Sequence, residues 1–188
     1  MNALKNLTKT CLIVASLSAS TTAIAENDDR TWMTDAGDNL QYAVPVFAAG
    51  YALYKGDWDG FWQTAEGAVY TSLATHALKY SVSEERPNGM DDNSFPSGHT
   101  SAAMQGAAFL SMRYGWEVGV PATVVASFVG YSRVEAKYHY TRDVLAGTAI
   151  AWGVQYAITE LGFSPTEFII SPFVDNTNGF GVHVSGKF

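Results

Sequence analysis

The chain has 188 residues, of which 11 are lysine or arginine and 18 are aspartate or glutamate, so its formal net charge is −7. This acidic balance argues against a nucleic acid as partner. A single cysteine, Cys11, excludes an internal disulfide, and the length suits one domain with a full core.

The first 25 residues have the pattern of an export signal. Two lysines give a positive start, an apolar stretch runs from Cys11 to Leu17, and Ala23-Ile24-Ala25 is a small-residue cleavage site. The apolar stretch is too short to span a bilayer, which argues against a membrane anchor. We therefore expect a signal peptide at 1–25 and a single periplasmic domain at 26–188. That domain has nine basic and eighteen acidic residues, a net charge of −9, and no cysteine.

Most of the remaining chain is typical of uncharged helices joined by short polar or glycine-containing connections. The polar segment from Glu26 to Asp38 is expected to be irregular or briefly helical. Five helices are predicted after it, over Asn39–Tyr54, Trp58–Tyr80, Ser101–Arg113, Val118–Ser132 and Asp143–Leu161. The short connections favour an antiparallel helical bundle, so the predicted fold class is all-α.

The C-terminal residues follow a different pattern. An apolar run, Phe168–Val174, precedes a polar loop that ends in Asn178-Gly179, and Phe180, Val182 and Val184 then alternate with small or polar residues. Asn-Gly next to an alternating segment is typical of a β-hairpin. We expect a small C-terminal hairpin after the helices.

The uncharged helical runs are short for a membrane span. They are fourteen to sixteen residues long, whereas a spanning helix needs roughly twenty. The mean hydropathy of the chain is only 0.00. Buried helices of a soluble bundle therefore fit the sequence better, and peripheral association with a membrane is the alternative.

Three short blocks carry side chains suited to chemistry on an anion. The first contains Lys79 and Arg86-Pro87. Seven residues are two helical turns, so a continuous helix would place both cations on one face before Pro87 ends it. Two such cations can clamp an oxyanion. The alternative is a solvated helix end with salt bridges to Glu84 and Glu85.

The second block is Pro96-Ser97-Gly98-His99. Pro96 fixes its φ and Gly98 can adopt backbone geometry closed to other residues, so we expect a tight turn that opens into a helix. Free N–H groups and the helix dipole there favour an anion, with His99 as a titratable neighbour. The alternative is an ordinary helix start capped by Thr100 or Ser101.

The third block is Ser132-Arg133, followed by His139 and Asp143. His139 and Asp143 are one turn apart if the segment is helical, or Asp143 reaches back from the start of the next helix. A carboxylate that holds one imidazole nitrogen leaves the other as a lone pair, which is the arrangement of a histidine nucleophile. The alternative is a surface His–Asp pair, with Arg133 bridging to Glu135.

Together the blocks read K-x6-RP, PSGH and S-R-x5-H-x3-D, in that order. This resembles the phosphatidic acid phosphatase type 2 superfamily, which also contains bacterial class A acid phosphatases and vanadium haloperoxidases. The resemblance covers Lys79 to Asp143. It implies a helical bundle and a phosphatase that works without a metal or another cofactor.

The resemblance also implies a role for each residue of the blocks. Five of them would bind phosphate oxygens: Lys79, Arg86, Ser97, Gly98 and Arg133. His139 would be the nucleophile that forms a phosphohistidine, His99 the general acid, and Asp143 the residue that orients His139. This agrees with the needs of phosphoryl transfer, which are positive charge around the phosphoryl oxygens and an in-line nucleophile and leaving group.

Departures from the class A acid phosphatases bear on the substrate. Only eight residues separate Pro87 from Pro96, and the turn begins Asn-Ser-Phe-Pro where those enzymes usually have Gly-Ser-Tyr-Pro. This favours lipid phosphatases, whereas the export signal and low hydropathy favour a soluble enzyme. We expect a periplasmic phosphatase for phosphate monoesters or pyrophosphates, including lipids such as phosphatidic acid or undecaprenyl diphosphate. The alternatives are a non-specific acid phosphatase, a vanadium haloperoxidase, or a binding protein with a decayed site.

Overall fold

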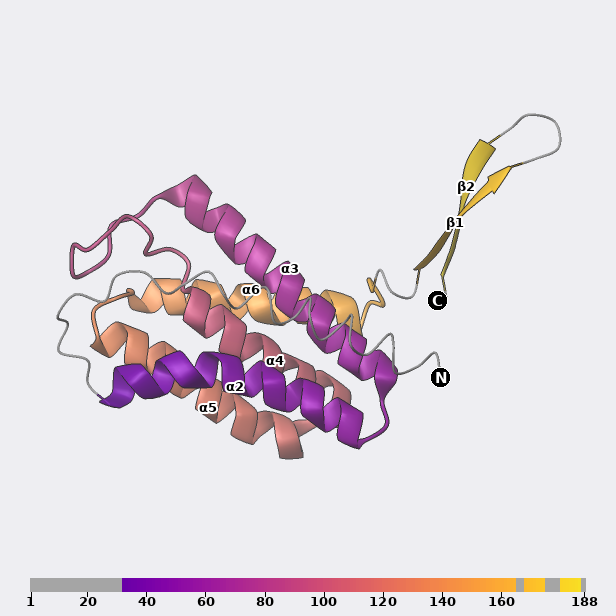
Figure 1. Ribbon diagram of the computed structural model, residues 1–188. Coiled ribbons are helices and arrows are strands. Elements are labelled where there is room, and N and C mark those ends of the chain that lie inside the picture. The colour runs from indigo at the N-terminus through magenta and orange to yellow at the C-terminus, as the bar shows by residue number, and fades with distance from the viewer. Residues whose placement is uncertain (1–31, 165–167, 175–179, 187–188) are drawn as a thin grey trace. The chain divides into compact units, whose positions relative to one another are not determined.

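The computed structural model describes residues 32–164, 168–174 and 180–186. Two features expected from the sequence, the signal peptide at 1–25 and the turn at Asn178-Gly179, lie outside the described residues. Five helices pack as a bundle, which confirms the predicted all-α class. They are shown in Figure 1: α2 (Trp32–Tyr54), α3 (Trp58–Val82), α4 (Gly98–Tyr114), α5 (Trp116–Glu135) and α6 (Thr141–Thr159).

Two strands follow the helices. β1 (Phe168–Val174) pairs antiparallel with β2 (Phe180–Gly186). Val174 lies opposite Phe180, and Phe168 lies opposite Gly186. This register is that of the small hairpin expected at the C-terminus.

Helix α4 is the centre of the bundle, because it packs against each of the other four helices. Most of its buried side chains are small, as at Ala103 and Ala107, and the large exceptions are Met104, Gln105, Phe109 and Leu110. Small side chains let neighbouring backbones approach closely. A Cβ added at Gly106 would lie 2.7 Å from the backbone of Pro45 on α2.

The first helix is longer than predicted. It begins at Trp32 rather than Asn39, so the residues from Trp32 to Asp38 are also helical. Thr34 and Asp38 lie on this first part of α2 and make contact with Arg133 of α5. Polar side chains that find a charged partner are compatible with a packed helix, which is why the hydrophobic pattern missed this segment.

Large apolar side chains lie on the outside of the bundle. Val46 on α2, Leu73 on α3, Val124 on α5 and Leu145 on α6 are all between 60% and 70% exposed. The sequence led us to expect apolar helices whose side chains are buried. The small residues of the core fit this expectation, but these large apolar residues do not. Where such surface is contiguous, it marks contact with lipid or with another protein.

Within the described ranges, none of the helices combines the length and the hydrophobicity needed to cross a bilayer.

Candidate active site

All three sequence blocks meet at one end of the bundle. The starts of α2, α4 and α6 and the end of α5 lie together there (Figure 1). The end of α3 is tied to the same place through Lys79, whose Nζ donates to the backbone oxygens of Asn93 (2.6 Å) and Pro96 (2.9 Å). Residues far apart in the sequence are therefore neighbours at this end.

His139 and Asp143 form the buried floor of the site, where they are only 3% and 0% exposed. The alternative of a surface His–Asp pair is therefore wrong. His139 precedes α6, and Asp143 reaches back from the first turn of that helix. Asp143 Oδ2 accepts hydrogen bonds from the backbone N–H of Tyr140 (2.9 Å) and from Ser94 Oγ (2.5 Å).

The contact between His139 and Asp143 is electrostatic in this structure. His139 Nδ1 lies 3.6 Å from Asp143 Oδ2, which is longer than a hydrogen bond. Among the described residues, neither His139 Nδ1 nor Asp143 Oδ1 has a hydrogen-bond partner. A small movement of the imidazole toward Asp143 would give Nδ1 a hydrogen-bond partner.

The pKa of His139 is lowered to about 3. Burial is the largest cause, and the positive charges of Arg86 and Lys79 act in the same direction, while a hydrogen bond with the Ser94 backbone opposes them. The imidazole is therefore neutral near pH 7 and keeps a nitrogen lone pair. A neutral histidine among cations can act as a nucleophile toward an anionic phosphorus centre.

Arg133 is fully buried, at 1% exposed, and all of its contacts hold it in one orientation. Its Nη1–H donates to Asp38 Oδ1 (2.7 Å) and its Nη2–H donates to the Thr34 carbonyl (2.6 Å). Its Nε–H donates to Ser132 Oγ (3.1 Å). The suggested bridge from Arg133 to Glu135 is therefore replaced by a partner 95 residues away in the sequence.

The same Asp38 carboxylate also binds the second histidine. His99 Nε2 lies 3.0 Å from Asp38 Oδ1 and donates to it. Burial lowers the pKa of His99, and the charges of Arg133 and Arg86 lower it further, whereas Asp38 raises it. Burial would raise the pKa of Asp38, but His99 and Arg133 hold it below its usual value.

The remaining two cations come from the end of α3 and the loop after it. The expectation that one helix face carries both is wrong, because α3 ends at Val82 and Ser83 follows in a left-handed conformation with φ of 45°. Arg86 is held by the loop itself, where its Nε–H donates to Asp91 Oδ1 (2.7 Å). The suggested salt bridges of Lys79 and Arg86 to Glu84 and Glu85 are replaced by these contacts.

The pKa of Lys79 is low for a lysine. Burial, and then the nearby charge of Arg86, lower its pKa to about 8. Asp91 and Asp143 oppose this shift. Lys79 is therefore largely charged at pH 7 but loses its proton within two units above it.

The Pro96-Ser97-Gly98-His99 turn does open a helix, but in a different way from that expected. Ser97 is the N-cap of α4, with its Oγ 2.9 Å from Thr100 Oγ1 and 3.4 Å from the Thr100 amide. Gly98 is the first residue of α4 and is not among the glycines with positive φ in the described chain. A Cβ built at Gly98 would meet nothing within 4 Å, so this glycine leaves open space at the helix N-terminus.

Two positions allow backbones to approach the site. A Cβ at Gly147 on α6 would lie 2.6 Å from the carbonyl oxygen of Ser97, so α6 passes directly beneath the turn. A Cβ at Gly37 on α2 would lie 2.5 Å from Arg133 Nη2. These glycines bring the two helices close enough to hold the turn and the guanidinium.

Several site residues could not be found from the blocks. Asp38 lies 41 residues before Lys79, in the segment expected to be irregular or briefly helical. Ser94 stands two residues before the PSGH block, and Tyr138 lies below two guanidinium groups, 5.9 Å from Arg86 and 5.7 Å from Arg133. The one sequence feature that could have pointed to Asp38 is the pair of aspartates, Asp35 and Asp38, just before the uncharged run that forms the rest of α2.

Taken together, the site holds three cations, two histidines with lowered pKa and a helix N-terminus. An anion with several oxygens would find donors from Lys79, Arg86 and Arg133. Within residues 32–164 and the two strands, no group of three His, Cys, Asp or Glu side chains could hold a metal ion. The arrangement is suited to transfer of a phosphoryl group to a histidine.

Known proteins share both the sequence pattern and the fold. The PAP2 superfamily profile matches residues 60–165. A Lipid A 4'-phosphatase of Helicobacter pylori is 28% identical over 161 residues, which are 80% of this chain and 80% of that protein. A Lipid A 1-phosphatase of Porphyromonas gingivalis is 31% identical over 183 residues, which are 88% of this chain and 40% of that protein.

A solved structure has a similar fold. The first transmembrane PAP2 type phosphatidylglycerolphosphate phosphatase from Bacillus subtilis has a TM-score of 0.55 and 22% identity, over 86% of this chain and 87% of the other. The profile match covers more than half of the chain and includes all three blocks. The resemblance found in the sequence is thus confirmed, and the chain belongs to the PAP2 superfamily.

Proposed function

We propose that this protein is a lipid phosphatase that removes a phosphate group from an envelope lipid at the periplasmic side of a membrane. The observation that carries the proposal is the state of His139. It is buried and neutral, and it lies beside cations that would draw in a phosphate. Similarity to proteins named as Lipid A phosphatases supports a lipid substrate.

The first chemical step would be attack of a lone pair of His139 on the phosphorus atom. The bond from phosphorus to the leaving oxygen breaks, and a phosphohistidine forms. Lys79, Arg86 and Arg133 would neutralise the oxygens of the phosphoryl group in flight, with the N-terminal amides of α4 beside them. Asp143 would stabilise the positive charge that develops on His139.

The second histidine would transfer a proton in each of the two steps. His99, in the protonated form that Asp38 favours, would donate a proton to the leaving oxygen. It would then take a proton from water, which attacks the phosphohistidine and releases inorganic phosphate. This role requires that Asp38 keep the pKa of His99 high enough for protonation in the working pH range.

The location of the reaction is also part of the proposal. The expected signal peptide at 1–25 supports export. The large apolar side chains on the outside of the bundle support contact with lipid. Such contact would bring a lipid headgroup to the end of the bundle that holds the cations.

The decisive experiment is single-turnover hydrolysis of a lipid phosphate in mixed micelles, with rapid-quench detection of the phosphoenzyme. The native protein should form a transient phosphohistidine and release phosphate in the presence of a chelator. His139→Ala should do neither, whereas His76→Ala, which changes an exposed histidine of α3, should behave as the native protein does. A phosphoenzyme in His139→Ala, or activity that needs an added divalent ion, would refute the proposal.

A further inference from the structure

Two charged residues at positions that the sequence blocks leave unspecified form an ion pair beside the phosphate site. Glu84 is such a position in the first block, and Arg142 is the residue before Asp143 in the third. Arg142 Nη2 contacts Glu84 Oε1. The pair joins the loop after α3 to the first turn of α6, and neither residue takes part in the proposed reaction.

The ion pair completes a closed ring of contacts around the carboxylate of Asp143. The backbone oxygen of Glu84 accepts the N–H of Ser94 (2.8 Å). Ser94 Oγ donates to Asp143 Oδ2 (2.5 Å), and Asp143 Oδ1 lies 3.8 Å from Nε of Arg142. The Arg142 side chain then returns to the Glu84 carboxylate. We refer to these four residues, Glu84, Ser94, Asp143 and Arg142, as the Asp143 ring.

Arg142 is held in place although its side chain is 62% exposed. Its guanidinium lies over the ring of Tyr140, 4.7 Å from the centroid. The Tyr140 backbone N–H in turn donates to Asp143 Oδ2 (2.9 Å). Asp143 Oδ1 has no hydrogen-bond partner in the described part of the chain, so the charge of Arg142 is a neighbour of its unpartnered oxygen. A change at Arg142 therefore reaches the carboxylate that would orient the nucleophile.

The Asp143 ring also fixes the loop that supplies a phosphate-binding cation. Arg86 lies in the chain between Glu84 and Ser94, the two members of the ring that belong to this loop. Its Nε–H donates to Asp91, which is part of the same loop, so Arg86 moves when the loop moves. Ser94 alone would tie the loop to α6 at one point and leave it free to pivot. The ion pair adds a second point and prevents this.

The exposure of the ion pair suits it to positioning more than to stability. Exposed pairs stabilise a fold little, because solvent screens the charges and ordering two long side chains costs entropy. Misplacement of a reacting group by about 1 Å, in contrast, can cost about 100-fold in rate. Loss of the pair should therefore affect catalysis far more than folding.

We propose that Arg142 is a positioning residue for phosphoryl transfer. Through Glu84 it holds the loop that carries Arg86, and through Asp143 it holds the carboxylate that orients His139. This inference rests on the proposed phosphatase function and adds a determinant of its rate. Because the ring acts on geometry, it should matter more for the transition state than for a bound phosphate ion.

The test is a double-mutant cycle of Glu84→Ala, Arg142→Ala and the double variant, measured with two inhibitors. Inorganic phosphate resembles the ground state, whereas vanadate can adopt the trigonal-bipyramidal geometry of the transition state. Each single variant should bind vanadate about 5- to 50-fold less tightly and phosphate only about two- to threefold less tightly. The double variant should be no worse than the single ones, because all three lack the same tie.

Arg113→Ala is the matched control for Arg142→Ala. Arg113 forms a comparable ion pair with Asp57 (2.7 Å), in the last turn of α4, whereas the phosphate site lies at the first. This pair is less exposed, so its loss should lower the midpoint of denaturant unfolding more than Arg142→Ala does. The ratio of the phosphate to the vanadate inhibition constant should stay native. Equal changes of this ratio in the two variants would mean that Arg142 has only a structural role.

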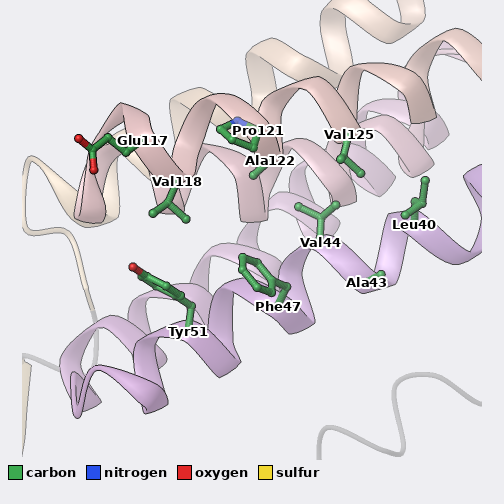
Figure 2. A pocket seen from close by; sticks show the side chains of 10 residues that line it. All are labelled: Leu40, Ala43, Val44, Phe47, Tyr51, Glu117, Val118, Pro121, Ala122 and Val125. Atoms are coloured by element: carbon green, nitrogen blue, oxygen red, sulfur yellow. The ribbon is translucent and has the colours of Figure 1, made fainter.

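Glu117→Ala is the control for removal of a carboxylate at Glu84. Glu117 is exposed and lies at the edge of an apolar pocket between α2 and α5, which Figure 2 shows and which no residue of the Asp143 ring lines. It precedes Arg133 by sixteen residues on α5, or about 24 Å at roughly 1.5 Å per residue. This variant should bind both inhibitors as the native protein does.

Equilibrium binding of vanadate and phosphate separates this inference from the proposed function, because it needs no turnover. If the native protein hydrolyses no ester, the phosphatase function is rejected, and the binding ratio still decides the role of the ring. If the native protein hydrolyses lipid phosphates and Arg142→Ala does so equally well, the function stands and the positioning role is overturned. Losses that multiply in the double variant, or a native protein that binds vanadate no more tightly than phosphate, would also overturn it.

Discussion

Asp38 Oδ1 accepts the Nη1–H of Arg133 at 2.7 Å and also lies 3.0 Å from His99 Nε2. A single carboxylate of α2 therefore links the buried arginine of α5 to the histidine at the start of α4. It orients a cation that would bind phosphate and raises the pKa of a histidine that would donate a proton. Both effects depend on the charge of Asp38.

Asp38→Asn should therefore change the pH dependence of catalysis as well as its rate. Without the carboxylate, burial and the nearby arginines lower the pKa of His99 further, so the protonated acid is lost at lower pH. The alkaline limb of kcat/KM should move to lower pH. The rate should fall by about 10- to 100-fold, the equivalent of roughly 1.5–3 kcal/mol for a charged hydrogen bond. The measurement is kcat/KM across pH for both proteins.

The control for this change is Asp57→Asn. Asp57 accepts two hydrogen bonds from Arg113 and one from Tyr114 at the start of α3, and so forms a carboxylate–arginine pair outside the site. Its loss should lower stability and leave the pH profile in place. If Asp38→Asn lowers the rate without moving the limb, Asp38 has only a structural role.

Much of the fold could be predicted because it depends on local pattern. Five runs with few or no charges mark the five helices, and the glycine and proline positions mark their connections. The start of α2 was missed because its polar residues pair with Arg133, a contact across 95 residues that no local pattern contains. The predicted end of α3 at Tyr80 is two residues before the observed end at Val82. The idea that the helix continues to Arg86 failed because Ser83 takes a left-handed conformation that serine rarely adopts.

The candidate site could be predicted only as a set of motif residues. The blocks contain His139, Asp143 and the three cations, and the structure brings them to one end of the bundle. The motifs could not reveal that Arg86 is held by Asp91 in a loop, or that Ser94 donates to Asp143. These contacts depend on how the loop after α3 folds over the start of α6.

Phosphate binding should weaken as the pH rises through about 8, where Lys79 loses its proton. Because its pKa is lowered, Lys79 is charged below that value and neutral above it. A bound anion raises this pKa, so the observed midpoint should lie at or above 8. The measurement is the inhibition constant of inorganic phosphate or vanadate between pH 6 and 10. Lys79→Ala should bind weakly throughout, and Lys55→Ala, an exposed lysine away from the site, should follow the native curve. A native curve that stays flat from pH 7 to 10 would contradict the assignment.

Gly147→Ala should disturb the turn that carries Ser97. The added methyl group would lie 2.6 Å from the Ser97 carbonyl oxygen, and a backbone atom cannot move away as a flexible side chain can. We expect a loss of about 1–3 kcal/mol in the free energy of unfolding and a lower kcat. Denaturant unfolding and kinetics test this.

Gly153→Ala on the same helix is the matched control, because a Cβ there meets nothing within 4 Å. Alanine is the better helix former, so this variant should gain up to about 1 kcal/mol. Equal effects of the two substitutions would mean that the close approach of α6 to the turn does not matter.

The last prediction separates the two histidines by the leaving group. If His139 is the nucleophile, His139→Ala should be nearly inactive with every ester. If His99 is the general acid, its value depends on how strongly the leaving oxygen needs a proton. An alkoxide needs one, whereas a nitrophenolate hardly does. General acid catalysis is worth about 10²–10⁴-fold, or roughly 3–5 kcal/mol.

His99→Ala should therefore lose most of this factor with an alkyl phosphate and clearly less with p-nitrophenyl phosphate. It should still form a phosphohistidine from the activated ester, because the nucleophile is intact. Asp143→Asn should lower the rates with both esters, since it acts through His139 and through the Ser94 hydrogen bond. The measurements are kcat/KM on both esters and rapid-quench detection of the phosphoenzyme. Equal losses of His99→Ala on the two esters would reject the acid role, because a group that only binds phosphate is indifferent to the leaving oxygen.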